Sequence, residues 1–363
     1  MKRVCGFFIL LVSLTVVICM NTLQAQIHKM YVGTYTSESE SKGVYVYDFD
    51  EKSGDAKLVK TIEMSNPSFL ARKGNVLYAV NEDTDGMLTA YDLSQDKVIS
   101  QVTTKGMHPC HISLSPKFPI AVVSNYSSGS LCIYSLNADG GINAMDDFLE
   151  FKGSSIDKSR QNESHIHSAF FSKDGARVYV SDLGADLIYV FEIDTKDGKF
   201  KFRKVQDIKT KLGGGPRHLV FSKDEKTLYS IMEMTGEVQV FQRENDSWVS
   251  KQLVPMYPEG FSGEHGGADI KLSKNGKELF ATNRGTAHFV FKYTVGKNGL
   301  LKVSSHSSVM GDSPRNLNIS PKGKYILISN QITQNISVFG AKLDSNLNLL
   351  QKLNIPKPVC VIF

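Results

Sequence analysis

Cysteine is scarce in this sequence and follows no recognisable spacing. Five cysteines occur in 363 residues, and no two of them form a CxxC pair. Cys5 and Cys19 lie in an N-terminal apolar segment, which leaves Cys110, Cys132 and Cys360 in the body of the chain. Three isolated thiols provide neither a disulfide framework nor a cysteine zinc site. The fold must therefore be stabilised by burial of apolar surface, for which a chain of this length is ample.

Long blocks of one charge are absent as well. The sequence has 42 Lys and Arg against 37 Asp and Glu, a formal net charge of +5 that is spread along the chain. Without Lys2 and Arg3 the net charge falls to +3. So weak a bias, with no basic block, argues against nucleic acid as a partner.

One long apolar run is present, at the N-terminus. The chain begins with MKR, continues with an apolar segment from Val4 to Met20, and has the small Ala25 before Gln26. This pattern predicts a cleaved signal peptide over residues 1–25. A membrane anchor is the alternative, although the run is short for a span. We expect residues 26–363 to be exported, for example to the periplasm, with no membrane span after cleavage; a cytoplasmic location is the second choice.

A repeated pattern of strands fills the rest of the chain. Each copy has a short apolar strand, a turn that begins with serine (Ser-x-x-Gly in three of the clear copies), a second strand, a polar tip and a third strand rich in Val, Tyr and Phe, usually followed by a fourth. The five clear copies begin ISLSPKFPIAVVSN, AFFSKDGARVYVSD, LVFSKDEKTLYSIM, IKLSKNGKELFATN and NISPKGKYILISN, and a weaker copy begins at Pro67. Alternating and β-branched apolar residues between turn signals predict strands throughout, and no segment has a convincing helical period.

The spacing of the copies predicts a β-propeller. The second strands are predicted to end at Asn81, Asn125, Asp182, Met232, Asn283 and Asn330, with gaps of 44 to 57 residues. Four strands at this repeat length are typical of propeller blades, whereas a β-sandwich does not explain so regular a repeat. The N-terminal MYVGTYT and GVYVYDFD segments lack a first strand, and the C-terminal PVCVIF supplies one. We therefore predict an all-β, seven-bladed propeller over residues 26–363, in which the C-terminal strand closes the N-terminal blade.

Two positions of the repeat, at one end of a hairpin, carry polar side chains in most copies. Five residues before the turn serine stand Cys110, His167, Arg217, Ala268 and Arg315; eleven residues after it stand Tyr126, Leu183, Glu233, Arg284 and Gln331. The start of one strand and the end of its antiparallel neighbour lie at the same edge. We expect His167, Arg217, Glu233, Arg284 and Arg315 to converge on one mouth of the channel, as a pocket for an anionic substrate. The alternative is that they are ordinary polar strand ends facing water.

Two histidines spaced two apart, His165 and His167, precede an apolar strand. Period-two geometry would put both on one side of the strand, and His-x-His is a metal motif in principle. Third ligands could come from His111, His218, Glu264 or His265. However, the aligned positions in other copies hold Arg217 and Arg315, whose charges repel a cation. We therefore expect no metal and favour a hydrogen-bonding or general-base role, with a purely structural pair as the alternative.

Motifs along the whole of residues 26–363 resemble those of one known family. They are YVGTYT, NPSFLA, PCHISLSP, NYSSGS, RQNESHIH, SDLGAD, GGGPRHLVFS, TNRG, SPRN and PKPVCVIF. Together they are similar to the lactonase family of seven-bladed propellers, which includes bacterial propeller-type 6-phosphogluconolactonase and fungal 3-carboxy-cis,cis-muconate lactonizing enzyme. The resemblance implies lactone chemistry without a cofactor. It also implies an active site of His167 (less well His165), Arg217, Glu233 and Arg284.

The resulting hypothesis is hydrolysis of a sugar-acid lactone, as in 6-phosphogluconolactonase. His167 or Glu233 would act as general base towards water, and Arg217 and Arg284 would stabilise the oxyanion. Substrate-binding roles are predicted for Arg315, and also for Arg160, His165 and His218; bidentate guanidinium geometry suits a phosphate or carboxylate.

Two features depart from the resemblance. The substrate of 6-phosphogluconolactonase is a cytoplasmic metabolite, whereas this chain has an export signal, and the EHGGADI segment puts Ala268 and Asp269 at the channel. Two other classes of function stay open: a muconate-lactonizing-type cycloisomerase, and a non-catalytic exported propeller that binds a sugar acid or a protein.

Overall fold

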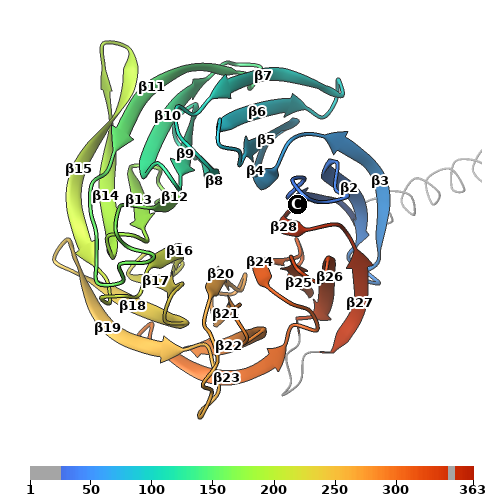
Figure 1. Ribbon diagram of the computed structural model, residues 1–363, viewed down its shortest axis with the longest axis vertical. Helices are drawn as coiled ribbons and strands as arrows, with labels where there is room; N and C mark the ends of the chain where they lie inside the picture. The colour runs from blue at the N-terminus through green and yellow to red at the C-terminus, as the bar shows by residue number, and fades with distance from the viewer. Residues whose placement is uncertain (1–25, 342–347) are drawn as a thin grey trace, which may run out of the picture.

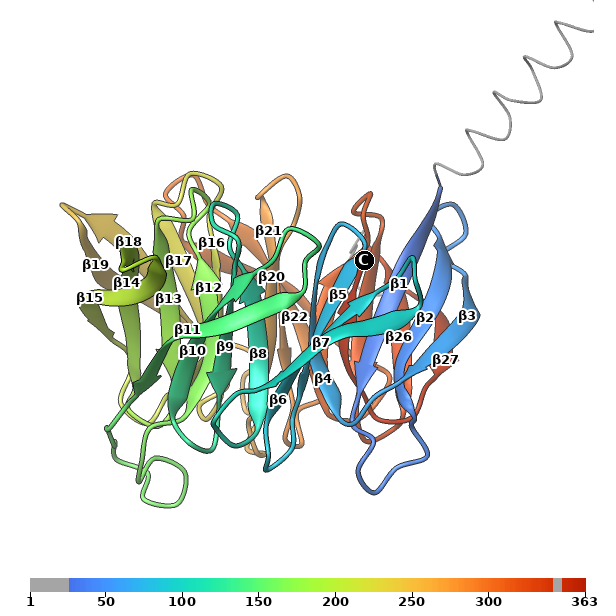
Figure 2. The ribbon, with the colours of Figure 1, turned by 90° about the horizontal axis from the view of Figure 1, so that it is seen from above.

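The computed structural model describes residues 26–341 and 348–363. Within these ranges it contains seven four-stranded antiparallel sheets and no helix. The sheets are arranged as blades around a central axis (Figure 1), and an edge-on view shows a disc whose strands run between its two faces (Figure 2). The predicted all-β, seven-bladed propeller is confirmed. The predicted signal peptide lies outside the described residues. Those residues include no helix with the length and hydropathy that a membrane crossing requires.

The four strands of each blade follow one another from the axis to the rim. The innermost strands are β4 (Pro67–Lys73), β8 (Pro109–Leu114), β12 (Ile166–Phe171), β16 (Pro216–Phe221), β20 (Gly267–Leu272), β24 (Pro314–Ile319) and β28 (Pro358–Ile362). The second strands are β5 (Val76–Asn81), β9 (Ile120–Asn125), β13 (Arg177–Asp182), β17 (Thr227–Met232), β21 (Glu278–Asn283), β25 (Tyr325–Asn330) and β1 (Ile27–Thr34).

The outer half of each blade is formed by its third and fourth strands. The third strands are β6 (Met87–Asp92), β10 (Ser130–Leu136), β14 (Leu187–Lys196), β18 (Glu237–Glu244), β22 (Phe289–Val295), β26 (Asn335–Gly340) and β2 (Gly43–Asp50). The fourth strands are β7 (Lys97–Thr103), β11 (Ile142–Glu150), β15 (Lys199–Lys209), β19 (Ser247–Pro255), β23 (Leu301–Ser308), β27 (Leu349–Asn354) and β3 (Ala56–Glu63). All six predicted ends of second strands agree with the structure.

The ring is closed by strands from the two ends of the chain. β28 pairs with β1 in antiparallel register, with Tyr31 opposite Ile362 and Val32 opposite Val361. The seventh blade therefore has the order β28, β1, β2, β3, as predicted, and β1 has no open edge.

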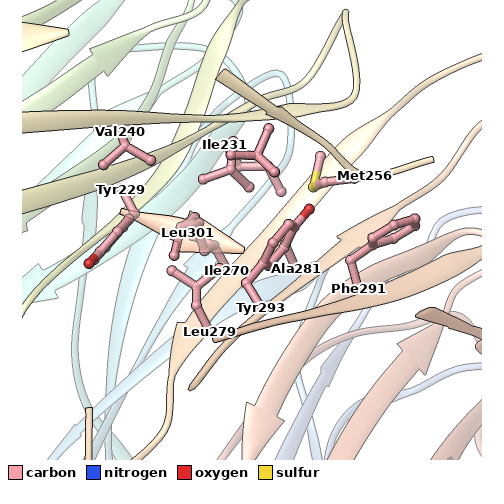
Figure 3. Packing of buried hydrophobic residues seen from close by; sticks show 12 residues of the cluster. Tyr229, Ile231, Val240, Met256, Ile270, Leu279, Ala281, Phe291, Tyr293 and Leu301 are labelled. Carbon is pink, nitrogen blue, oxygen red and sulfur yellow. The ribbon is translucent and has the colours of Figure 1, made fainter. Parts of the chain in front are cut away.

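Apolar packing between neighbouring blades forms the core. Each second strand is covered on both faces, which is why VLYAVN, IAVVSN and YILISN are nearly continuous apolar runs. Figure 3 shows one such contact, where Tyr229 and Ile231 of β17 pack with Leu279 of β21 and Tyr293 of β22. Each fully buried side chain of this size contributes about 1.5–3 kcal/mol to stability. The blades are thereby held at fixed positions around the axis.

The beginning of every innermost strand has the same local structure. Five of the seven begin with proline, which has no N–H to donate to a ladder and is tolerated at a first strand position. One extra residue follows as a β-bulge, as at Pro216↔Met232 followed by Leu219↔Ser230. The same one-residue shift occurs in the other six blades. A bulge changes the direction of the side chains at and after it, and this bulge places polar groups at one end of the channel.

Candidate active site

Two sets of side chains surround this end of the channel, which we call the mouth. The inner set lies at the bulge of each innermost strand and consists of Ser68, Cys110, His167, Arg217, Ala268, Arg315 and Val359. The outer set follows each second strand and consists of Tyr35, Glu82, Tyr126, Leu183, Glu233, Arg284 and Gln331. Both sets lie on one face of the disc because the two strands of each hairpin are antiparallel.

Glu233 is surrounded by three guanidinium groups from three different segments. Nη2 of Arg284 lies 2.8 Å from Oε2, and Nη2 of Arg160 lies 2.8 Å from Oε1. Nε of Arg217 lies 3.1 Å from Oε2, close enough for an ion pair although its N–H is not aimed at that oxygen. Burial alone would raise the pKa of Glu233, but Arg284, Arg217 and Arg160 together lower it to about 2. Glu233 is therefore a carboxylate at neutral pH and a weak base.

His167 lies beside this ion cluster and is almost fully buried. Its Nε2 is 4.0 Å from Oε2 of Glu233, and its Nδ1 is 3.9 Å from Sγ of Cys110. Burial, and then the charge of Arg217, lower the pKa of His167 well below its usual value. The imidazole is therefore neutral at pH 7 and keeps a lone pair for accepting a proton. Burial raises the pKa of the Cys110 thiol, which stays protonated.

His165 occupies a different position from the one expected. The strand β12 begins at Ile166 and bulges at His167, so the period-two argument that put both histidines on one side of a strand does not apply. Instead, His165 lies before the strand and stacks on Tyr126 with ring centroids 4.6 Å apart. His167 meets the same tyrosine edge-on at 5.5 Å. Tyr126 thus separates the half-buried ring of His165 from the buried ring of His167.

His218 and Asp269 lie next to Arg217, one residue further along the innermost strands. Nδ1 of His218 is 2.9 Å from Oδ1 of Asp269, and Nε2 is 3.5 Å from Nη1 of Arg217. His218 is buried, with 2% of its surface exposed. Its predicted substrate-binding role stays a prediction. Nη1 of Arg217 also donates to the carbonyl of Ala268, which fixes the guanidinium from a second side.

Arg315 and Arg160 approach the mouth from different directions. Arg315 donates to the hydroxyl of Tyr35 at 2.7 Å, across the ring from His167. Arg160 comes from the loop before β12, and its side chain is 46% exposed. Its Nη2 also donates to the hydroxyl of Tyr126 at 3.2 Å. The loop arginine therefore lies over Glu233 on the solvent side.

The mouth carries an excess of positive charge. Four guanidinium groups (Arg160, Arg217, Arg284 and Arg315) face two carboxylates (Glu82 and Glu233), so the net charge of this set is positive by two. Burial, followed by the charges of Arg284 and Arg315, lowers the pKa of Arg217 to about 10. Within the described residues, no group of three or more His, Cys, Asp or Glu is placed to hold a metal ion.

Fold and site together define a propeller with an enzyme-like polar centre in one mouth of its channel. Residues 29–363 match the family model described as Lactonase, 7-bladed beta-propeller. A 6-phosphogluconolactonase of Formosa agariphila is 34% identical over 337 residues, which is 89% of this chain and 95% of that protein. The chain belongs to this lactonase family, and the predicted family is confirmed.

Solved structures share the fold over nearly their whole length. A structure from Bacteroides fragilis has a TM-score of 0.85 at 33% identity, covering 93% of this chain and 98% of that one. The periplasmic gluconolactonase of Pseudomonas aeruginosa, PpgL, has a TM-score of 0.84 at 31% identity with the same coverage. The similarity therefore extends over the whole ring.

Proposed function

We propose that this protein hydrolyses a sugar-acid lactone, as 6-phosphogluconolactonases do, at the mouth that holds His167, Arg217, Glu233 and Arg284. The observation that carries the proposal is the convergence of a neutral buried imidazole with guanidinium groups that a carboxylate fixes in place. The family and the gluconolactonase relatives support the same substrate class.

His167 is the proposed general base. Its imidazole takes a proton from a water molecule as the water oxygen attacks the lactone carbonyl carbon, a contribution on the order of 10²–10⁴-fold. Glu233 is less suited to this step because its pKa is about 2. The pKa of His167 is depressed by burial and by the positive charge of Arg217. A bound anion would offset that charge and make the imidazole a stronger base when substrate is present.

Arg217 and Arg284 are the proposed oxyanion partners. Attack of water moves an electron pair onto the carbonyl oxygen, and fixed donors in a desolvated site stabilise the resulting charge most. A guanidinium has five N–H donors, so pairing with Glu233 leaves others for the oxyanion. When the intermediate collapses, the bond between the carbonyl carbon and the ring oxygen breaks. The leaving oxygen then takes the proton held by His167, which gives an open-chain hydroxy acid.

The excess positive charge of the mouth favours an anionic lactone. A phosphate or carboxylate on the substrate would neutralise charge that no carboxylate in the mouth offsets. Arg160, which is half-exposed above Glu233, is best placed to contact a phosphate that extends towards solvent. The N-terminal sequence and the periplasmic gluconolactonase relative both favour an exported enzyme that acts outside the cytoplasm.

Proton release during hydrolysis provides the test. Residues 26–363 are purified and assayed at pH 7 with D-glucono-1,5-lactone, its 6-phosphate and muconolactone, each corrected for spontaneous hydrolysis. We expect acceleration of the two sugar lactones, with the higher kcat/KM for the phosphorylated one. Acceleration of muconolactone alone would support the cycloisomerase class instead, and acceleration of none would reject lactone hydrolysis.

A further inference from the structure

The blade β24–β27, the closing blade (β28, β1, β2 and β3) and the blade β4–β7 are neighbours in the ring (Figure 1), and a second polar cluster lies where their residues meet. Tyr35 follows β1, Glu82 follows β5, and Arg315 lies at the bulge of β24. The hydroxyl of Tyr35 donates to Oε2 of Glu82 at 2.9 Å and accepts from Nη2 of Arg315 at 2.7 Å. The guanidinium carbon of Arg315 lies 5.3 Å from the centre of the tyrosine ring. The hydrolytic steps proposed above do not use Tyr35 or Glu82.

The buried side chain of Asn66 holds this cluster in place. Its Oδ1 accepts the N–H groups of Thr36 and Ser37 at 2.8 and 3.0 Å, directly after Tyr35. The N–H of Glu82 donates to the carbonyl of Asn66 at 3.0 Å. One residue of the NPS motif therefore links the two loops that carry Tyr35 and Glu82. A subsite supported by such bonds is pre-organised for a ligand.

The two carboxylates of the mouth have different surroundings. Glu233 contacts three guanidinium groups, whereas within the described part of the chain the carboxylate of Glu82 has one hydrogen-bonding partner, the hydroxyl of Tyr35. Burial is the main cause that raises the pKa of Tyr35, so its hydroxyl keeps the proton that it donates to Glu82. A carboxylate offers about four acceptor positions. Glu82 is partly exposed, and most of its acceptor positions remain for a ligand.

We propose that Tyr35, Glu82 and Arg315 form a hydroxyl-binding subsite that selects polyhydroxylated lactones; this inference rests on the proposed hydrolytic function. Neighbouring hydroxyls of a sugar lactone donate to Glu82, and Arg315 donates to a hydroxyl oxygen. A lactone with a carboxylate on this side meets the negative charge of Glu82 and is repelled. The subsite thus favours a sugar lactone over a muconolactone, and Arg315 binds hydroxyl groups rather than phosphate.

The substitution Glu82→Gln tests whether the subsite needs the negative charge of Glu82, because glutamine has nearly the same shape as glutamate and no charge. We expect kcat/KM for D-glucono-1,5-lactone to fall at least about tenfold, as for loss of a hydrogen bond to a charged group. We expect kcat/KM for muconolactone to stay constant or rise. The matched control is Glu63→Gln, an exposed glutamate at the end of β3. An unchanged rate with gluconolactone, or an equal fall with both lactones, overturns the proposal.

A second pair of measurements separates this inference from the proposed function. If the parent hydrolyses no lactone, binding of D-gluconate is compared by calorimetry. Weaker binding by Glu82→Gln than by the parent supports the subsite even though hydrolysis has failed. Equal binding of D-gluconate by the two proteins, or binding by neither, overturns the subsite as well as the proposed function. Should Glu82→Gln not fold, Tyr35→Phe removes the hydroxyl between Glu82 and Arg315, and the same selective loss is expected.

Discussion

The imidazole of His218 joins the carboxylate of Asp269 to the guanidinium of Arg217. Nδ1 lies 2.9 Å from Oδ1 of Asp269, and Nε2 lies 3.5 Å from Nη1 of Arg217. Burial, and then the charge of Arg217, lower the pKa of His218 to about 4, so the ring is neutral at pH 7. A neutral ring that donates from Nδ1 to the carboxylate can accept from the arginine with Nε2. The pair therefore holds the guanidinium of Arg217 in place.

The first prediction concerns this positioning pair. Asp269→Asn should lower kcat about tenfold and change KM little, because a misplaced Arg217 weakens stabilisation of the transition state more than substrate binding. His218→Asn, which keeps a donor towards Asp269, should lower kcat less. The matched control is Asp224→Asn in an exposed turn. Unchanged kcat in both Asp269→Asn and His218→Asn would show that the pair is not needed to orient Arg217.

The second prediction concerns the ion cluster. Glu233→Gln leaves three guanidinium groups without their carboxylate, so the free energy of unfolding should fall by about 3–5 kcal/mol, as for a broken buried ion pair. Urea unfolding would measure the change. Glu237→Gln is a fitting comparison, since Glu237 is 13% exposed and, within the described residues, forms one ion pair, with Lys211. We expect a smaller loss there, because one ion pair is broken instead of three. Equal losses would mean that the cluster does not depend on Glu233.

The third prediction concerns the dependence of the rate on pH. His167 has a pKa well below its usual value, so its base form persists in acid where an ordinary histidine would be protonated. With uncharged D-glucono-1,5-lactone, kcat/KM should stay nearly constant from pH 7.5 to 6 and fall only at lower pH. A fall centred at pH 6.5 or above would contradict this assignment of the base.

The fourth prediction concerns stability in acid. Burial lowers the pKa of His111, His167 and His218, all at most 5% exposed. Unfolded histidines take up protons near pH 6.5, so below that pH the unfolded state binds more protons than the folded state. The free energy of unfolding should fall as pH decreases from 6.5 towards 4, by up to about 1.4 kcal/mol per pH unit for each histidine.

A single substitution tests this linkage. His111 packs between Phe69 and Phe170, with centroids 4.4 and 4.6 Å away, so His111→Phe replaces one ring by another. Urea unfolding at pH 7, 6 and 5 should show a smaller pH slope than in the parent, by up to about 1.4 kcal/mol per unit at the lowest pH. The slope is compared rather than the absolute stability, because the variant also loses the bond from the N–H of Ala169. An unchanged slope would mean that His111 is not a source of acid sensitivity.

The fifth prediction concerns ring closure. Val361 of β28 is 1% exposed, so Val361→Ala should lower the free energy of unfolding by about 2 kcal/mol. Val98→Ala on the outermost strand β7, where the side chain is 51% exposed, should change it by less than about 0.5 kcal/mol. Deletion of residues 358–363 removes β28 and exposes the edge of β1, and should abolish cooperative thermal unfolding. Unchanged unfolding after the deletion would contradict closure by this strand.

The fold was predictable from sequence because its signals are local and repeated. Second strands end at residues such as Asn125 and Asn330, whose amides bond to nearby loops and strands, so an apolar run and a turn residue mark each boundary. The closing strand could be inferred because one end of the chain lacks a first strand and the other supplies it. The sequence did not show the β-bulge at the start of each innermost strand. A register shift of one residue leaves no local sequence pattern, so the position of Arg217 at a bulge could not be predicted.

The site was predictable only where the repeat was clear. His167, Arg217, Glu233 and Arg284 stand at fixed distances from a turn serine, and the structure brings them together. Tyr35 and Glu82 were missed because their blades lack the turn serine from which the repeat positions are counted, although both follow a second strand like Glu233. The role of Asp269 depends on contacts between blades, to His218 and Asn316, which no repeat position encodes. Catalytic and binding roles for all these residues stay predictions.

The most direct test compares the parent with His167→Asn in initial-rate hydrolysis of 6-phosphoglucono-1,5-lactone at pH 7. The asparagine keeps a polar group of similar position but cannot accept a proton at this pH. We predict that the parent accelerates hydrolysis above the spontaneous rate and that the variant, folded as judged by thermal unfolding, loses about 10²-fold or more in kcat/KM. Equal kcat/KM for the two proteins, or a parent no faster than the spontaneous reaction, would contradict a hydrolytic centre built on His167.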